Sequence, residues 1–436
     1  MPQDAPLREP VPAALSKESR APGARLWGVL RQARLNRHEI AGSLGDMGTF
    51  LPLLVGMASQ NGLSFAPALF FAGLFNIVTG LAFSIPMAVQ PMKAIATVAI
   101  TSKLPVSQIL AAGITVSLIV LVLGLTGLID TLNRAIPKSV VRGLQLALGL
   151  SLLMKGLQMV TATHTWFGAD SYLTASLAAL GVLALFSARI PSALVLFGAG
   201  LLLAAWKDPA VVGLVHFDWS FPHWTPIAWS DFTRAFPVAA LPQIPLTTLN
   251  SVIAVCALSA QLFPDRPATP RRVSISVGLM NLVAGWFGGM PMCHGAGGLA
   301  GQYRFGARTN GSILFLGGAK IIVAVLFGAS LMALCRAFPG SLLGVMLAVS
   351  GIELSLVTRD QTTRTEATIM LLTAGVCLGA DNIALGFVLG LLLAWALRLE
   401  RLFTVERERV TKDSGVRNQA SEVGNHEPAR VGRNER

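Results

Sequence analysis

Charged residues are scarce in this sequence. Lys, Arg, Asp and Glu together make up 13% of its 436 residues, against about 25% in an ordinary soluble domain. Hydrophobic residues make up 53%, and the mean hydropathy is +0.62. This composition excludes an ordinary soluble domain and indicates an integral membrane protein that crosses the lipid bilayer several times.

Cysteine is also scarce, and its positions exclude several kinds of site. Cys256, Cys293, Cys335 and Cys377 all fall in apolar stretches without the spacing of metal ligands, which predicts buried free thiols and no metal or cofactor. Cys293 and His294 are adjacent in the chain, so their side chains do not readily face each other. With no other pairing of a nucleophile and a base at the expected membrane midplane, we do not expect an enzyme.

The two ends of the chain are polar. Residues 1–38 contain no apolar segment of the kind found in a signal peptide, and like residues 399–436 they lack apolar periodicity. We expect both to be disordered tails. The net charge is +12, but basic residues beside apolar spans set the orientation of a membrane protein, so we do not infer nucleic-acid binding.

Apolar runs divide the rest of the chain into two sets of seven. A membrane-spanning helix needs about 20 apolar residues, and shorter runs are tolerated where protein covers the backbone. The first set occupies residues 39–58, 67–86, 90–101, 106–128, 137–158, 171–187 and 191–206. After a loop at 207–235, the second set occupies 236–258, 273–290, 294–304, 312–334, 340–357, 365–379 and 381–398. The sequence therefore predicts an all-α polytopic membrane protein with 14 transmembrane segments.

Charges in the loops orient these segments. With the amino terminus inside, the inner loops carry eleven Lys or Arg and four Asp or Glu, whereas the outer loops carry five of each. Basic residues gather on the cytoplasmic side of membrane proteins. We therefore expect both termini in the cytoplasm, the loop at 207–235 outside, and a location in the bacterial inner membrane.

An internal repeat relates the two sets. Residues 74–87, LFNIVTGLAFSIPM, align with 279–292, LMNLVAGWFGGMPM, at an offset of 205, and residues 137–149 align with 339–351 at an offset of 202. Each copy holds an odd number of spans, so the second copy enters the membrane upside down. The sequence predicts a 7+7 inverted repeat formed by residues 39–206 and 236–398.

Two runs in the repeat, 90–101 and 294–304, are too short to cross the bilayer. Each follows a Pro-Met pair, which predicts extended chain leading into a half-helix. Half-helices that begin at the midplane point free N–H groups at the space between the copies, and this favours an anion. The residues predicted to bind it are Gln90, Met92, Lys93, His294, Gly295, Ala296, Gly297 and Gly298. Alternatively, the glycines only permit close helix packing, and the lysine extends to the membrane interface.

Three segments resemble a known family. GSLGDMGTFLPLLVGMA (42–58), VQPMKAIA (89–96) and PMCHGAGGLAGQYRFGARTNGS (291–312) closely resemble signature segments of the molybdate transporter family, which is related to the sulfate permeases (SulP). The resemblance implies a core domain of spans 1–4 and 8–11 and a gate domain of spans 5–7 and 12–14. It also implies that substrate lies between the third and tenth spans.

Polar residues in spans 1 and 8 supply further candidates for binding. Gln243, Thr247 and Asn250 lie at i, i+4 and i+7 on one face of the eighth span. They would donate to substrate, or equally would bond neighbouring helices. Thr49 is expected to face the same cavity from the first span. His294 either titrates beside the anion or bonds to a buried carbonyl group.

Two carboxyl groups at membrane depth are candidates for proton coupling. Asp46 in the first span and Glu353 in the gate domain are costly to bury without a function. Alternatively, Asp46 forms a structural ion pair with Lys93, and Glu353 contributes to closing salt bridges.

The resemblance implies a secondary transporter that imports molybdate, a tetrahedral dianion, together with protons. The residue patterns by themselves indicate a dianion without distinguishing molybdate from tungstate or sulfate. A permease for sulfate or another oxyanion, and an anion channel that needs no coupling carboxylate, are the alternatives. A homodimer in the bilayer is an open alternative for assembly.

Overall fold

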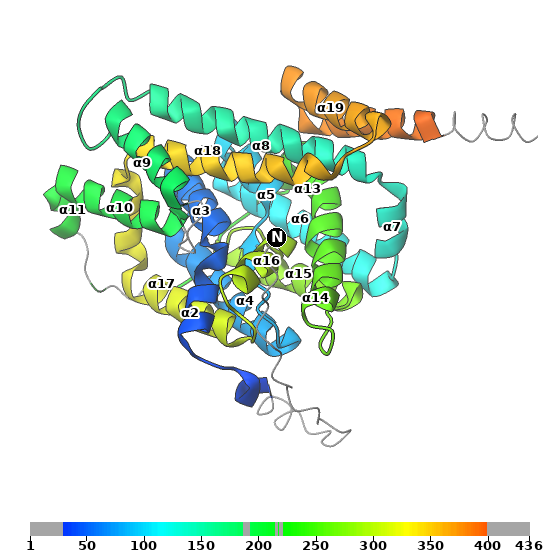
Figure 1. Ribbon diagram of the computed structural model, residues 1–436, viewed down its shortest axis with the longest axis horizontal. Coiled ribbons are helices and arrows are strands. Elements are labelled where there is room, and N and C mark those ends of the chain that lie inside the picture. Colours follow the sequence, from blue (N-terminus) through cyan, green and yellow to red (C-terminus); the bar gives the residue numbers. More distant parts are fainter. Residues whose placement is uncertain (1–28, 186–191, 214–216, 218–220, 399–436) are drawn as a thin grey trace, which may run out of the picture.

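The computed structural model describes residues 29–185, 192–213, 217 and 221–398, and helices make up most of it (Figure 1). The predicted tails at 1–28 and 399–436 lie outside the described residues. Residues 29–36, which we expected to be part of a disordered tail, instead contact the second half of the chain. The Arg34 N–H donates a hydrogen bond to Thr309 Oγ1 at 3.2 Å.

The helices follow the predicted apolar runs. The first half forms α2 (Arg37–Ser43), α3 (Met47–Asn61), α4 (Phe65–Phe83), α5 (Lys93–Ser102), α6 (Val106–Thr126), α7 (Ile129–Ala135), α8 (Lys138–Thr161), α9 (Tyr172–Leu185), α10 (Ser192–Lys207) and α11 (Pro209–Gly213). The second half forms α12 (Trp229–Ala235), α13 (Leu241–Leu246), α14 (Val255–Leu262), α15 (Pro270–Ala284), α16 (Ala296–Arg304), α17 (Gly311–Ala337), α18 (Gly340–Leu356), α19 (Arg364–Gly379) and a last helix at Ile383–Arg398.

Six helices among the described residues are long and apolar enough to cross a membrane. They are Phe65–Phe83, Val106–Thr126, Lys138–Thr161, Trp229–Leu262, Gly311–Gly328 and Gly340–Asp360, and the bent pair α2 and α3 would form a seventh. The helices α5, α9, α10 and Ile383–Arg398 are apolar but shorter. Every predicted range thus holds helix, while the total of 14 spans and their inverted arrangement stay predictions.

The first span is not the single helix that the sequence predicts. A 3-10 turn, η1 (Leu44–Asp46), joins α2 to α3, and the two helices are bent by 41°. Gly45 in this turn lies against α16, because a Cβ atom there would be 2.5 Å from the carbonyl oxygen of Gly301. Close backbone approach to the second half of the chain therefore accompanies the break.

The eighth span also departs from a regular α-helix. Two π-helical segments, η2 (Phe236–Ala240) and η3 (Thr247–Ala254), interrupt the run α12–α13–α14. Pro237, Pro242 and Pro245 fall within or between these segments. Proline removes a backbone donor and clashes with the preceding turn, so the hydrogen-bond pattern shifts along this span.

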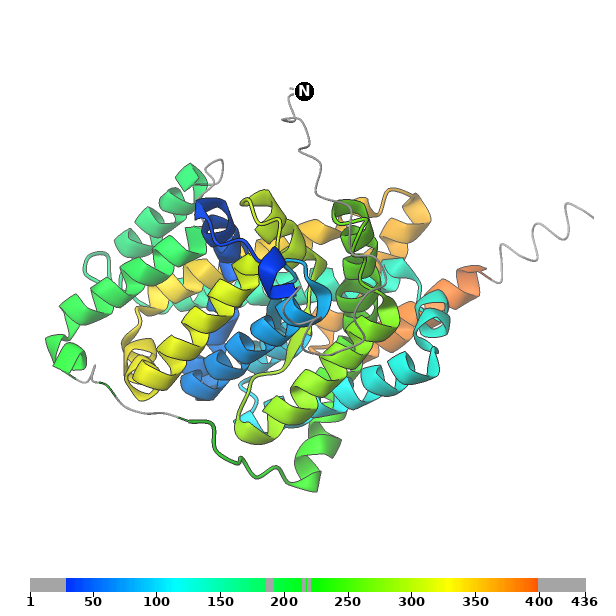
Figure 2. The same ribbon diagram turned by 90° about the horizontal axis from the view of Figure 1, so that it is seen from below.

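Helices from the two halves pack in pairs: α4 on α17, α15 on α6 and α8 on α18. The yellow helix α17 lies beside the blue helix α4 in Figure 2, and α8 runs along α18 in Figure 1. Glycines allow this contact. A Cβ atom at Gly317 would lie 2.6 Å from the carbonyl oxygen of Gly73, and one at Gly73 would lie 2.6 Å from that of Gly317. Small residues let helix backbones approach closely in a membrane.

Gly317→Val should therefore destabilise the protein, by about 1–3 kcal/mol as overpacking does. The matched control is Gly318→Val, because a Cβ atom at Gly318 meets no atom within 4 Å. Both variants carry the same helix-propensity change, so thermal unfolding in detergent isolates the packing effect. Equal shifts of the unfolding temperature in the two variants would contradict the close contact.

Two short strands join the halves at the centre. β1 (Val89–Pro91) pairs antiparallel with β2 (Met292–His294), with Gln90 opposite Cys293. These are the extended segments that the sequence predicts before each half-helix. Matching asparagines hold them: Asn76 Oδ1 accepts from the Val89 N–H at 2.8 Å, and Asn281 Oδ1 accepts from the Met292 N–H at 2.6 Å. The strand pair therefore fixes the starts of α5 and α16 next to each other.

Candidate substrate-binding site

A cavity of about 610 Å³ opens beside the starts of α5 and α16. One wall comes from η1, α3, α5 and α16, and the other comes from α8, α9, α10, α18 and the 3-10 turn η5 (Val357–Asp360). The volume is far larger than one water molecule needs. Its two walls belong to the elements that the family resemblance assigns to a core and to a gate.

The polar lining of the cavity is mainly cationic. Lys93, Arg304 and Arg359 contribute three positive charges, and Glu353 is the one carboxyl group among the described lining residues. No ion-pair partner for Lys93 is present among the described residues. Such an excess of positive charge favours an anion in the cavity.

The start of α16 is open toward this cavity. Its N-cap residue is Gly295, in an extended conformation, and no side chain among the described residues accepts from the first N–H groups of the helix. Gly297 lines the cavity and is exposed, and a Cβ atom there would meet no atom within 4 Å. The first N–H groups of this half-helix, from Ala296 onward, have no intrahelical acceptor. They are available to a ligand that enters the cavity.

The neighbouring glycines have packing roles. A Cβ atom at Gly295 would clash with the Gln90 side chain, which is buried in β1. Gly298 is buried within α16. The two explanations offered by the sequence therefore apply to different residues: Gly297 keeps the cavity open, and Gly295 permits packing.

At the start of α5, Lys93 is half-buried and lines the cavity, together with Thr97 one turn further on. The N-cap residue Met92 is fully buried, and its N–H donates to the Pro291 carbonyl at 2.9 Å. Gln90, in β1, and Met92, directly after it, thus lie at the pair of strands β1 and β2 rather than on the cavity surface. Thr49 lines the cavity from α3.

The three predicted donors of the eighth span do not share one face. Gln243 and Thr247 are buried and bonded to each other, with Gln243 Nε2 donating to Thr247 Oγ1 at 2.8 Å. Asn250 lies in the π-helical segment η3, where α-helical spacing does not apply. The α-helical spacing that was expected to bring Asn250 onto the face of Gln243 and Thr247 therefore does not apply, and none of the three residues is among those that line the cavity.

His294 is also placed away from the cavity. Its side chain is fully buried, its Nε2 atom lies 2.9 Å from Ser276 Oγ on α15, and its ring meets Phe83 edge-on. Asp46 ends the turn η1, and its side chain lies outside what the structure describes. Glu353, the other residue predicted to couple protons, lines the cavity.

Sequence reasoning did not single out Arg359, Ser350 or Thr97 as cavity residues. A periodic signal for part of this set exists, because Met346, Ser350, Glu353 and Val357 recur every three or four residues along α18 and η5. Extending the helical face around Glu353 would have found Ser350, but neither Arg359 nor Thr97.

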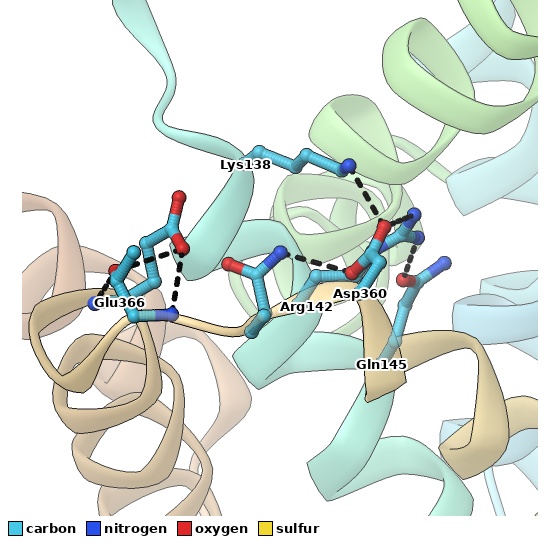
Figure 3. A network of polar contacts seen from close by, with 7 residues as sticks. Lys138, Arg142, Gln145, Asp360 and Glu366 are labelled. Carbon is cyan, nitrogen blue, oxygen red and sulfur yellow. Dashed lines mark hydrogen bonds and ion pairs between the residues drawn. The ribbon is translucent and has the colours of Figure 1, made fainter.

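Ion pairs anchor the segment that carries Arg359. The neighbouring Asp360 accepts hydrogen bonds from Arg142 Nε at 3.0 Å and Arg142 Nη2 at 2.7 Å, and it lies 2.8 Å from Lys138 Nζ (Figure 3). Arg142 also donates to Gln145 Oε1 at 2.7 Å. Since Arg142 and Lys138 belong to α8, this network ties η5 to α8 at the rim of the cavity.

The fold is that of a membrane transporter. The structure is similar to the transmembrane domain of the cyanobacterial bicarbonate transporter BicA, with a TM-score of 0.57, 14% identity, and coverage of 82% of this chain and 97% of that chain. It is also similar to the murine anion transporter Slc26a9 in the inward-facing state, with a TM-score of 0.61, 13% identity, and coverage of 89% and 74%. The chain thus shares the fold of these two transporters.

Sequence similarity identifies the family. A family model described as "Molybdate transporter of MFS superfamily" matches residues 38–152 and 235–354. Molybdate transporter 2 of Arabidopsis thaliana is 42% identical over 84% of this chain and 88% of its own length. Molybdate transporter 1 of Chlamydomonas reinhardtii is 34% identical over 82% and 91%. The chain belongs to the molybdate transporter family, an integral membrane family of transporters and not of enzymes.

Proposed function

We propose that the protein imports molybdate by alternating access and holds the anion between the open start of α16 and Lys93 of α5. One observation carries this proposal: the N–H groups at the start of α16 and Lys93, for neither of which the described residues supply a side-chain partner, border the same cavity. Molybdate is a tetrahedral dianion whose four oxygens accept hydrogen bonds. Convergent N–H donors and a positive charge match both its shape and its charge.

The two walls of the cavity support an alternating-access mechanism. The proposed core contributes α3, α5 and α16, and the proposed gate contributes α8, α9, α10 and α18. Movement of one wall against the other would expose the anion to each side of the membrane in turn. The cavity extends to Arg304 and Arg359, which the distribution of loop charges assigns to the cytoplasmic side. The structure thus corresponds to an inward-facing state in this proposal, with both termini in the cytoplasm of a bacterial cell.

Glu353 is the proposed carrier of the coupling proton, because a carboxylate beside a bound dianion is favoured only when it is protonated. Glu353→Gln mimics the protonated form. Molybdate binding should persist, whereas the rate of uptake should lose its dependence on external pH. The measurement is uptake into proteoliposomes over a range of pH values. Asp46→Asn tests the second predicted carboxyl group in the same assay.

The matched control for Glu353→Gln is Glu366→Gln. Glu366 forms the capping box of α19 with Thr363, outside the cavity, and glutamine also serves in a capping box. Its uptake should keep the wild-type pH profile. An unchanged profile in Glu353→Gln as well would remove Glu353 from the coupling step. If proton movement accompanies uptake in none of the proteins, an anion channel is favoured.

The choice of molybdate over other oxyanions is tested by titration calorimetry of the purified protein with molybdate, tungstate and sulfate. We expect tight binding of molybdate, comparable binding of tungstate and weaker binding of sulfate. Sulfate binding as tight as molybdate binding would instead indicate a general oxyanion permease.

A further inference from the structure

A side chain from α13 already accepts hydrogen bonds from the first turn of α5. Gln243 Oε1 accepts hydrogen bonds from the Ala94 N–H at 2.8 Å and from the Ile95 N–H at 3.3 Å. The Gln243 side chain is only 2% exposed and does not line the cavity. In this structure, two of the N–H groups at the start of α5 are therefore unavailable to a ligand.

The two half-helices α5 and α16 differ in whether a described side chain accepts from the N–H groups at their start. At α16 no side chain caps the helix, and Gly297 leaves its first turn open to the cavity. A side chain from α13 caps α5, whereas the start of α16 is left to whatever enters the cavity. The start of α16 thus offers its backbone N–H groups to an anion, whereas two of those at the start of α5 are taken.

Thr247 fixes the orientation of the Gln243 amide. Gln243 Nε2 donates to Thr247 Oγ1 at 2.8 Å, and Thr247 is fully buried. With the amide nitrogen held by Thr247, the amide oxygen points at α5. An uncharged oxygen caps the helix without cancelling its positive end, which carries roughly half an elementary charge.

The helical elements that pack against α13, which carries Gln243, contain no acidic residue. The helix α13 packs against α5, α6, α8, η2 and η3. Of these, α6, η2 and η3 have no charged residue, α5 has Lys93, and α8 has Lys138, Arg142 and Lys155. These elements therefore leave the positive potential of the α5 start and Lys93 uncancelled, and Glu353 is the one carboxyl group among the described residues that line the same cavity.

We infer that Gln243 is a positioning residue that makes the oxyanion site one-sided. It takes up two N–H groups of α5 with a neutral oxygen, so that α5 attracts the dianion by charge through its helix end and Lys93. The backbone hydrogen bonds to the dianion come from the start of α16. This inference rests on the proposed function, since it assumes that an oxyanion enters the cavity.

Gln243→Glu is the direct test, because a glutamate oxygen can still accept from the Ala94 and Ile95 N–H groups while the substitution introduces a negative charge. The Thr247 hydroxyl can donate to the second carboxylate oxygen in place of the lost amide donor. Above the pKa of the introduced carboxyl group, its negative charge opposes the dianion, and molybdate affinity should fall by about tenfold or more. As the pH falls through that pKa, the carboxyl group becomes neutral and affinity should return toward the wild-type value. The measurement is titration calorimetry with molybdate between pH 5.5 and 8.5.

Gln108→Glu serves as the control, because it makes the same change in the first turn of α6, outside the cavity lining. Its affinity should follow the wild type at every pH. A cap with a purely structural role would also leave Gln243→Glu at wild-type affinity, since glutamate satisfies the same two N–H groups.

A second pair of variants applies if Gln243→Glu does not fold. Thr247→Val removes the acceptor that orients Gln243 and should weaken molybdate binding about threefold to tenfold, the range of one hydrogen bond. Thr247→Ser keeps the hydroxyl group and should restore binding to within about twofold of wild type. Wild-type affinity in Thr247→Val would contradict the orienting role.

The outcomes for the function and for the inference are separate. If the wild-type protein binds no molybdate, the proposed function fails. If the wild-type protein binds molybdate and Gln243→Glu binds it equally well across the pH range, the inference alone fails.

Discussion

Lys93→Ala should lower the affinity for molybdate by about tenfold to a hundredfold. A hydrogen bond to a charged group is worth about 1.5–3 kcal/mol, and about 1.4 kcal/mol corresponds to a factor of ten. Lys93 is a cavity cation with no ion-pair partner among the described residues, so its removal leaves no described carboxylate without its partner. The protein should therefore remain folded while binding is lost, as measured by titration calorimetry and thermal unfolding.

The matched control removes a charge from the other end of the same helix. Lys103 is exposed and has a positive φ of 51°, a conformation that asparagine tolerates. Lys103→Asn should bind molybdate as the wild type does. Wild-type affinity in Lys93→Ala would exclude this lysine from the site, and an equal loss in both variants would point to a general effect of net charge.

Gly297→Leu should abolish measurable molybdate binding without unfolding the protein. The leucine side chain would enter the cavity, since a Cβ atom at Gly297 meets no atom within 4 Å. It would occupy the space in front of the first N–H groups of α16. Because leucine favours a helix more than glycine does, by up to about 1 kcal/mol, the protein without ligand should be at least as stable as the wild type. Binding and stability are thus expected to change in opposite directions.

Two further substitutions serve as comparisons for Gly297→Leu. Gly375→Leu in α19 has the same open surroundings but lies outside the cavity lining, so it should keep wild-type binding. Gly301→Leu, one turn along α16, would force a Cβ atom to within 2.6 Å of the Gly45 carbonyl oxygen, so it should lose stability instead. Retained molybdate binding in Gly297→Leu would show that the anion does not use the start of α16.

The two short helices α5 and α16 and the extended segments before them could be predicted because strong local rules govern them. The Pro-Met pairs at 86–87 and 291–292 and the short apolar runs predicted extended chain followed by short helices. Asn76 and Asn281, matched in the alignment, then hold the two strands in the structure. In these segments local propensity and tertiary structure agree.

The details of spans 1 and 8 could not be predicted, because tertiary contacts override local pattern there. The turn at Leu44–Asp46 accompanies a contact between Gly45 and Gly301, which lie far apart in the sequence. The π-helical segment from Thr247 changes which side chains share a face. The bond from Gln243 to α5 likewise joins residues about 150 positions apart, and spacing within one span carries no information about it.

The most direct test of the central claim is the position of the anion itself. Crystals of the protein grown with tungstate, a heavy analogue of molybdate, would locate the tungsten atom by its anomalous scattering. Our account predicts a single strong peak in the cavity, within contact of the Gly297 N–H and Lys93 Nζ. A peak only at the rim beside Arg304 and Arg359, or outside the cavity, would contradict binding of the anion between the two half-helices.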